Sequence, residues 1–147
     1  MELRSVGAEG LEEHPIEDLK GLMEAADGFL WLDIPEMDQE AERLSEEVFG
    51  FDPRAIRDCK ERSHIPKVFP HEGYLFMAMH SLAPGPAGHL HLLEIDMFIG
   101  SRYLVTVHGP YGRGVSPDVG RVEVETVHER LNDGSLTWLP ESSDALG

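Results

Sequence analysis

Residues 28–35 have the sequence Gly-Phe-Leu-Trp-Leu-Asp-Ile-Pro, in which the apolar run Phe29–Leu32 directly follows the glycine. A short continuous apolar run with turn-forming residues on both sides is typical of a strand buried on both faces of a sheet. Such strands occur in sheets that are covered by helices. The segment therefore predicts a central strand in a protein with helices packed on its sheet.

Helical patterns lie on both sides of this strand. Apolar residues recur every three or four positions over 15–26, and Pro15 suits the first turn of a helix. Asp38 can cap a second helix that reaches about residue 49. The pair Asp52-Pro53 predicts a third helix over 53–61, and a valine-rich pattern predicts a last one over 118–131.

The remaining segments favour strands at 1–6, 74–80, 89–99 and 103–107, with a strand-like pattern that begins at Lys67 and a Pro/Gly loop at 84–88. The predicted order is β-α-β-α-α-β-β-β-α, which indicates an α/β or α+β class. A length of 147 residues with 41% hydrophobic residues is enough for one core. We therefore expect one domain over 1–147, with a frayed tail at 139–147.

Charge limits the possible partners. The chain has 28 acidic and 12 basic residues, a formal net charge of -16. Such a charge repels phosphate backbones, so nucleic acid is excluded as a partner, whereas cations, including divalent metal ions, are favoured. One cysteine, Cys59, and the absence of a secretory leader indicate a cytoplasmic segment. No apolar run is long enough to span a membrane.

Side chains with catalytic or metal-binding potential are present but form no established motif. His89 and His91 would share one strand face, a spacing that suits a transition-metal pair, although no third ligand follows at a fixed distance. Cys59 has no CxxC partner, so a buried helix thiol is favoured over a nucleophile. His80 and His108 end predicted strands without a Ser, Cys or Asp motif that would make a triad.

Asp33 follows the buried strand. A carboxylate there can be catalytic in an open α/β sheet, but Ile34-Pro35 comes next, so a role in capping or in a turn explains it more simply. Gly109–Gly114 matches no phosphate-binding loop. From the residues alone, the chain is an acidic α/β domain without a recognisable active site.

Three stretches nevertheless resemble one family. Residues 28–35 are similar to the strand "W-[LI]-D-[LI]" of CorA-type divalent-cation transporters, the magnesium family with zinc-transporting relatives. Residues 49–58, continued by 65–68 and 73–76, resemble its segment "FG-hP-hhhED…RPK…YhFhhh", and residues 94–100 with 103–108 resemble its paired strands "hhhFhg-NYLhThh". The three blocks cover a little over half of the chain, in the family's order.

The resemblance implies an αβα sandwich with a mixed sheet flanked by helices. It implies no enzyme but the cytoplasmic, ion-sensing domain of a homopentameric transporter at the cell membrane. A stalk helix and two transmembrane helices would follow Gly147. Two alternatives stay open: a stand-alone domain that regulates a separate partner, and a zinc-transporting relative. The residues also leave open a zinc hydrolase built on His89, His91 and nearby acids.

The resemblance carries one site residue. Asp58 lies where the family has an acidic residue that binds a divalent ion between subunits, with its partner carboxylate on a neighbour's stalk. A carboxylate with retained waters suits Mg²⁺. Arg57 stands where an acid is more usual and Ile65 where arginine is, and these departures, together with eight histidines, leave Zn²⁺ or Co²⁺ as alternatives.

Overall fold

The computed structural model describes residues 1–7, 10–25, 28–63, 65–112 and 115–132. The strands are β1 (Glu2–Gly7), β2 (Gly10–His14), β3 (Phe29–Ile34), β4 (Lys67–His71), β5 (Tyr74–Pro84), β6 (Leu90–Gly100) and β7 (Tyr103–His108). The α-helices are α1 (Leu19–Glu24), α2 (Gln39–Glu47), α3 (Pro53–Asp58) and α4 (Asp118–Asn132), and 3₁₀ turns cover Ile16–Asp18 and Pro86–Gly88. None of these helices is long and apolar enough to cross a membrane.

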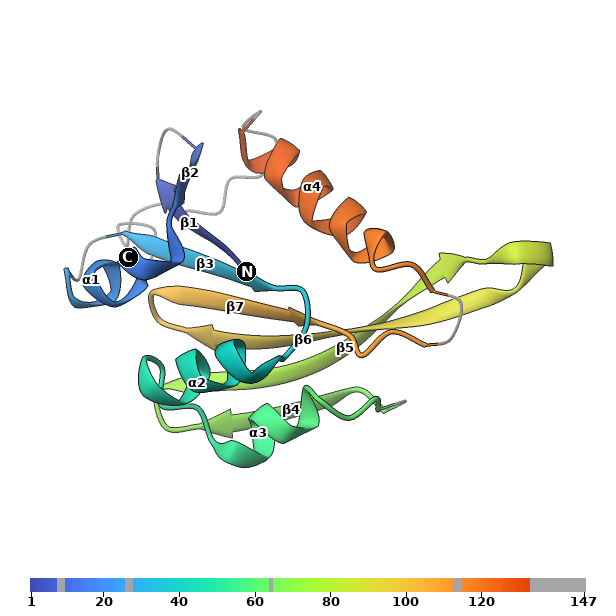
Figure 1. The fold of residues 1–147 in the computed structure, drawn as a ribbon, viewed down its shortest axis with the longest axis horizontal. Helices are drawn as coiled ribbons and strands as arrows, with labels where there is room; N and C mark the ends of the chain where they lie inside the picture. The colour runs from blue at the N-terminus through green and yellow to red at the C-terminus, as the bar shows by residue number, and fades with distance from the viewer. Residues whose placement is uncertain (8–9, 26–27, 64, 113–114, 133–147) are drawn as a thin grey trace, which may run out of the picture.

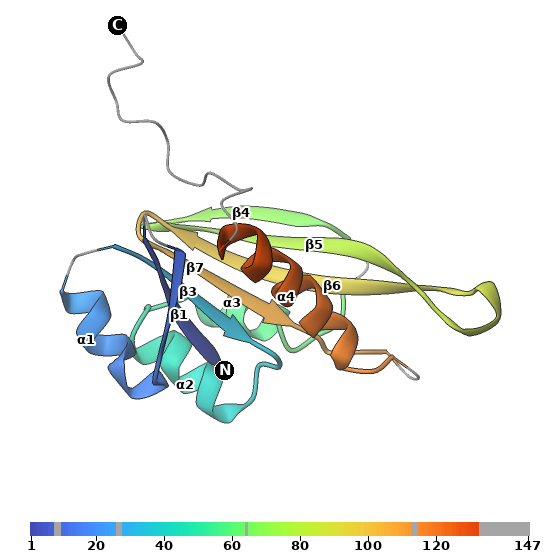
Figure 2. The same cartoon turned by 90° about the horizontal axis from the view of Figure 1, so that it is seen from above.

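The seven strands form one mixed sheet in the order β2-β1-β3-β7-β6-β5-β4. Its one parallel pair is β3 with β7, and the other neighbours are antiparallel. Helices α2 and α3 cover one face of the sheet and α4 lies over the other (Figures 1 and 2). The αβα layering and the mixed sheet predicted above are therefore confirmed.

The predicted central strand is correct. β3 lies inside the sheet, and five of its six residues are buried. The aromatic side chain of Phe51, which precedes α3, stacks on Phe98 of β6 with ring centroids 3.9 Å apart. Apolar residues of α3, Ala55 and Ile56, are also buried in this core. Packing of α2 and α3 against the sheet thus forms the main hydrophobic core.

Three elements differ from the sequence-based expectations. β2 was not expected, because Leu11 is the one large apolar residue among its five. The helix expected over 15–26 is reduced to a 3₁₀ turn and the six-residue α1, since Pro15 has an extended ψ of 145° and cannot start an α-helix. The helix expected over 53–61 ends at Asp58. The expected tail 139–147 lies outside the described residues.

The hairpin of β5 and β6 is longer than expected and extends beyond the sheet. Its register pairs Tyr74 with Gly100 and continues to Pro84 with Leu90, whereas β7 pairs only with residues 95–99 of β6. Residues 80–94 therefore form a two-stranded arm that projects away from the helices (Figure 1).

Helix α4 is tied to β2 at its C-terminal end. The side-chain oxygen of Asn132 accepts a hydrogen bond from the Leu11 amide at 3.2 Å. Gly10 has a φ of +112°, and a Cβ at this position would lie 2.7 Å from the same Asn132 oxygen. Glycine is thus required both for the backbone conformation and for the close approach of α4.

Candidate functional site

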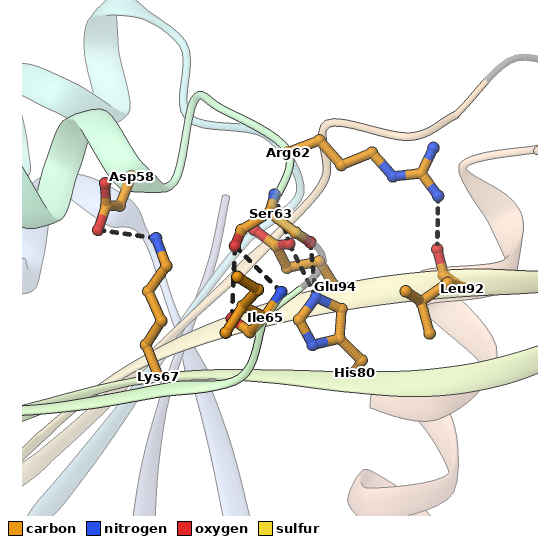
Figure 3. Close-up of polar contacts among 8 residues, drawn as sticks. All are labelled: Asp58, Arg62, Ser63, Ile65, Lys67, His80, Leu92 and Glu94. Carbon is orange, nitrogen blue, oxygen red and sulfur yellow. Dashed lines mark hydrogen bonds and ion pairs between the residues drawn. The ribbon is translucent and has the colours of Figure 1, made fainter.

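Asp58, the metal ligand proposed from the resemblance, is the last residue of α3. Asp52 starts this helix, since its carboxylate accepts a hydrogen bond from the Arg54 amide at 2.8 Å, and Pro53 occupies the first turn. A carboxylate at the C-terminal end of a helix is opposed by the helix dipole. The Lys67 ammonium of β4 compensates, with Nζ 3.1 Å from Asp58 Oδ2 (Figure 3).

The Asp58–Lys67 pair is accessible from solvent. The side chains of Asp58 and Lys67 are 31% and 25% exposed. Ion pairs that are open to water contribute little stability, about 0–1 kcal/mol. A competing cation can therefore displace Lys67 from Asp58 at small cost.

The loop that follows Asp58 is fixed to the base of the β5–β6 arm. Glu94 of β6 accepts a hydrogen bond from the Ser63 amide at 2.8 Å and lies 3.0 Å from His80 Nε2 (Figure 3). The same His80 nitrogen lies 2.7 Å from the Ser63 carbonyl oxygen, and the Arg62 guanidinium donates to the Leu92 carbonyl at 3.0 Å. The end of α3 and the arm are thus held together by polar contacts.

These contacts change the interpretation of His80. The sequence placed it at the end of a strand, but β5 continues to Pro84 and His80 lies within it. Its side chain is 7% exposed and already bonded to Glu94 and Ser63. A positioning role for the loop, rather than acid–base chemistry, fits this geometry.

Two further groups lie buried behind α3. Cys59 is 1% exposed, and burial, followed by the charge of Asp96, raises the pKa of its thiol well above the ordinary range. The expected buried, unreactive thiol is therefore confirmed. Asp96 of β6 is also 1% exposed, and burial followed by the charge of Glu94 raises its pKa to about 7. Neither Asp96 oxygen has a hydrogen-bond partner among the residues that the structure describes.

A second polar cluster, not expected as a unit, lies on the α4 side of the sheet. Asp33 Oδ1 accepts hydrogen bonds from Thr106 Oγ1 at 2.5 Å and is 2.8 Å from His108 Nε2. The Trp31 indole donates to Thr106 Oγ1 at 3.0 Å. Asp33 and His108 end the two parallel strands, β3 and β7, so their side chains meet at one edge.

The interpretation of Asp33 as a cap or turn residue was therefore wrong. The sequence placed Asp33 and His108 correctly at strand ends, but a parallel pairing between strands some 75 residues apart could not be read from local pattern. The signal that could have suggested it is the pair of buried strands that each end in a polar, titratable residue.

This edge opens into a cleft of about 560 Å³ between the sheet and α4. Asp33 and His108 lie at its base. Arg4 of β1 also lines it, with its guanidinium 5.2 Å from the centre of the Trp31 ring and paired with Glu2 and Glu13. The cleft thus has a polar, largely acidic wall instead of an apolar core.

The histidine pair of the arm does not form a metal site with its neighbours. His89 precedes β6 and is exposed, and His91 is half-buried within the strand. Across the described part of the chain, no group of three or more His, Cys, Asp or Glu side chains is placed to hold a metal ion. Asp58 is thus one carboxylate without further ligands from its own described residues, and an ion there would need ligands from elsewhere.

Comparison with known proteins gives a family and a fold. A sequence model of the family described as "CorA-like Mg2+ transporter protein" matches residues 26–114, more than half of the chain. A curated protein of Bacillus subtilis (strain 168), "Putative metal ion transporter YfjQ", is 32% identical over 78 residues, which are 53% of this chain and 24% of that protein.

Two solved structures have a similar fold. The full-length CmaX protein aligns with a TM-score of 0.68 at 14% identity, covering 91% of this chain and 39% of that one. The soluble domain of CorA from Methanocaldococcus jannaschii aligns with a TM-score of 0.53 at 16% identity, covering 85% and 46%. The chain thus spans about a quarter of the curated relative and less than half of either solved chain.

Proposed function

The chain belongs to the CorA-like Mg²⁺ transporter family, and we propose that it forms the cytoplasmic regulatory domain of a divalent-cation transporter. The family is one of transporters rather than enzymes, which confirms the expectation that the chain is not an enzyme and removes support from the hydrolase built on His89 and His91. In this proposal the chain senses the transported ion, Mg²⁺, and adjusts an ion pathway formed elsewhere in a homopentamer.

The observation that carries the proposal is the Asp58–Lys67 pair. A partly exposed carboxylate is held by a cation at 3.1 Å, at the end of a helix, in a family that handles divalent cations. Mg²⁺ commonly binds through one or two carboxylates and keeps its remaining waters, so Asp58 can supply one ligand without a preformed cage. The other ligand would come from a neighbouring subunit.

The same geometry suggests how loss of the ion is transmitted. Without an ion, Lys67 neutralises Asp58, and the subunits, each with a large negative charge, repel one another. With an ion at the interface, that repulsion is screened and the Lys67 ammonium is released. Because the loop after Asp58 is bonded to His80, Glu94 and Leu92, a shift of α3 moves the β5–β6 arm as well.

Calorimetric titration of Mg²⁺ into the complete transporter that contains this chain tests the proposal. The Asp58→Asn variant should lose one Mg²⁺ per subunit interface, because the amide keeps the shape but not the charge. Glu40→Gln, an exposed acid on α2, serves as the matched control and should bind Mg²⁺ as the unmodified protein does. Equal Mg²⁺ uptake by the Asp58→Asn variant and the unmodified protein would remove the proposal.

A further inference from the structure

The cleft between α4 and the parallel strand pair has the size and charge of a cation site. Its volume of about 560 Å³ lies within the range of small-ligand pockets. Two guanidinium groups face five carboxylates, so the wall is net negative with the histidines neutral; the carboxylates are those of Glu2, Glu13, Asp33, Asp118 and Glu125.

One buried carboxylate has an oxygen available to a ligand. Asp33 is 5% exposed and lines the cleft, and both of its hydrogen bonds, from Thr106 and His108, end on Oδ1. Oδ2 accepts no hydrogen bond from the residues that the structure describes. Because the two bonds fix the carboxylate in place, Oδ2 is a rigid acceptor at the base of an acidic cleft.

Helix α4 supplies the opposite wall from one of its faces. Asp118, Arg121, Glu125 and His128 are spaced by three and four residues, so they share one side of the helix, and all four line the cleft. Asp118 accepts a hydrogen bond from Ser116 Oγ at 3.0 Å, whereas Glu125 is exposed and forms no ion pair with the described residues. Glu125 is therefore a second carboxylate able to face a cation.

The charges of the cleft also decide against an anion. Arg4 is already balanced by Glu2 and Glu13, and its two nitrogen atoms without a hydrogen bond, Nε and Nη1, have no exposed surface. An anion would therefore enter a net negative cleft without a free donor from Arg4. A divalent cation, by contrast, reduces the repulsion among the carboxylates.

We propose that this cleft binds a hydrated divalent cation, with Asp33 Oδ2 as its one direct protein ligand and Glu125 hydrogen-bonded to its waters. No three donors converge closely enough to strip the ion, which favours Mg²⁺, an ion that dehydrates reluctantly, over Zn²⁺. Six waters need roughly 180 Å³ at about 30 Å³ each, so the hydrated ion fits. The bound ion draws α4 toward the sheet.

This site is independent of Asp58, which lies on α3 against the other face of the sheet. The test is therefore calorimetry with MgCl₂ on the 147-residue chain, at a concentration where light scattering gives the mass of one copy and no intersubunit site exists. One Mg²⁺ should bind per chain. Asp33→Asn should weaken it about tenfold and Glu125→Gln by a smaller factor of about three.

Two matched controls separate the cleft from general acidity. Asp18→Asn and Glu40→Gln remove exposed acids elsewhere and should leave the affinity unchanged. If Asp33→Asn lowers folding stability, Glu125→Gln still tests the site, because that side chain is exposed on α4. Absence of Mg²⁺ uptake by the single chain, or affinities unchanged in both cleft variants, would overturn the inference.

Mn²⁺ as a paramagnetic probe locates the ion directly. In amide spectra of the same chain, Mn²⁺ should broaden Thr106, Arg121 and Glu125 first and spare Arg57 and Lys60. Broadening centred on Arg57 and Lys60, with uptake lost in Asp58→Asn but kept in Asp33→Asn, would sink the cleft site and leave the proposed function standing.

Discussion

Replacing Asp96 with asparagine should stabilise the chain at neutral and alkaline pH. Asp96 is 1% exposed, and its two carboxylate oxygens have no hydrogen-bond partner among the described residues. Burial, and then the charge of Glu94, raises its pKa from 3.8 to about 7. The folded chain therefore holds a proton on Asp96 that the unfolded chain releases.

The sign and size follow from this difference. Below pH 3.8 both states carry the proton and Asp96 has no effect on stability. Between pH 3.8 and about 7 only the unfolded state ionises, so the free energy of unfolding falls by about 1.4 kcal/mol per pH unit, and the loss levels off above the folded pKa. The total loss is on the order of 4 kcal/mol at pH 8.

Urea unfolding of the unmodified chain and of Asp96→Asn, from pH 3.5 to 8.5, measures this effect. Asparagine resembles the protonated acid, so the two proteins should be about equally stable at pH 3.5, and the variant should gain up to about 4 kcal/mol by pH 8. Asp18→Asn, an exposed acid without a capping hydrogen bond, is the control and should change stability by less than about 0.5 kcal/mol at every pH. A difference between Asp96→Asn and the unmodified chain that stays flat across this range would refute the reasoning.

Three further outcomes are expected. Phe98→Ala should cost about 3–5 kcal/mol in urea unfolding, because Phe98 is fully buried and stacks on Phe51; a loss below 1 kcal/mol would contradict the core described here. Gly10→Ala should lower stability by about 1–3 kcal/mol and speed amide exchange at the C-terminal end of α4, since φ is +112° and the new Cβ meets Asn132; unchanged exchange would show that α4 is not tied there. Cys59 should react with a thiol reagent no faster than the chain unfolds at pH 8, because burial raises its pKa; rapid labelling of the native chain would exclude a buried thiol.

The sequence predicts most of the fold because most elements carry strong local patterns. β3 is a bounded apolar run, and α2 and α3 begin at Asp38 and Asp52, whose side chains cap them as expected. β2 was missed because an edge strand with Glu12 and Glu13 has little apolar periodicity. The arm was underestimated because the strand pattern of β5 weakens after His80 although the pairing with β6 continues.

The candidate sites were harder to predict, since they depend on contacts between distant segments. Lys67 pairs with Asp58 across the α3–β4 connection, and nothing in the local sequence of either residue indicates it. Asp33 and His108 were each weighed and set aside, because a local pattern gives no sign that β3 and β7 lie side by side in parallel. Asp96 gave no signal either, since its burial comes from packing under α3.

Regulation by internal Mg²⁺ is the central claim, and uptake by vesicles that contain the complete transporter tests it most directly. The initial rate of Mg²⁺ entry is measured with a fluorescent indicator at increasing internal Mg²⁺. We expect the rate of the unmodified protein to fall steeply as internal Mg²⁺ rises, and that of Asp58→Asn to stay high over the same range. The same steep fall in both proteins would contradict the account.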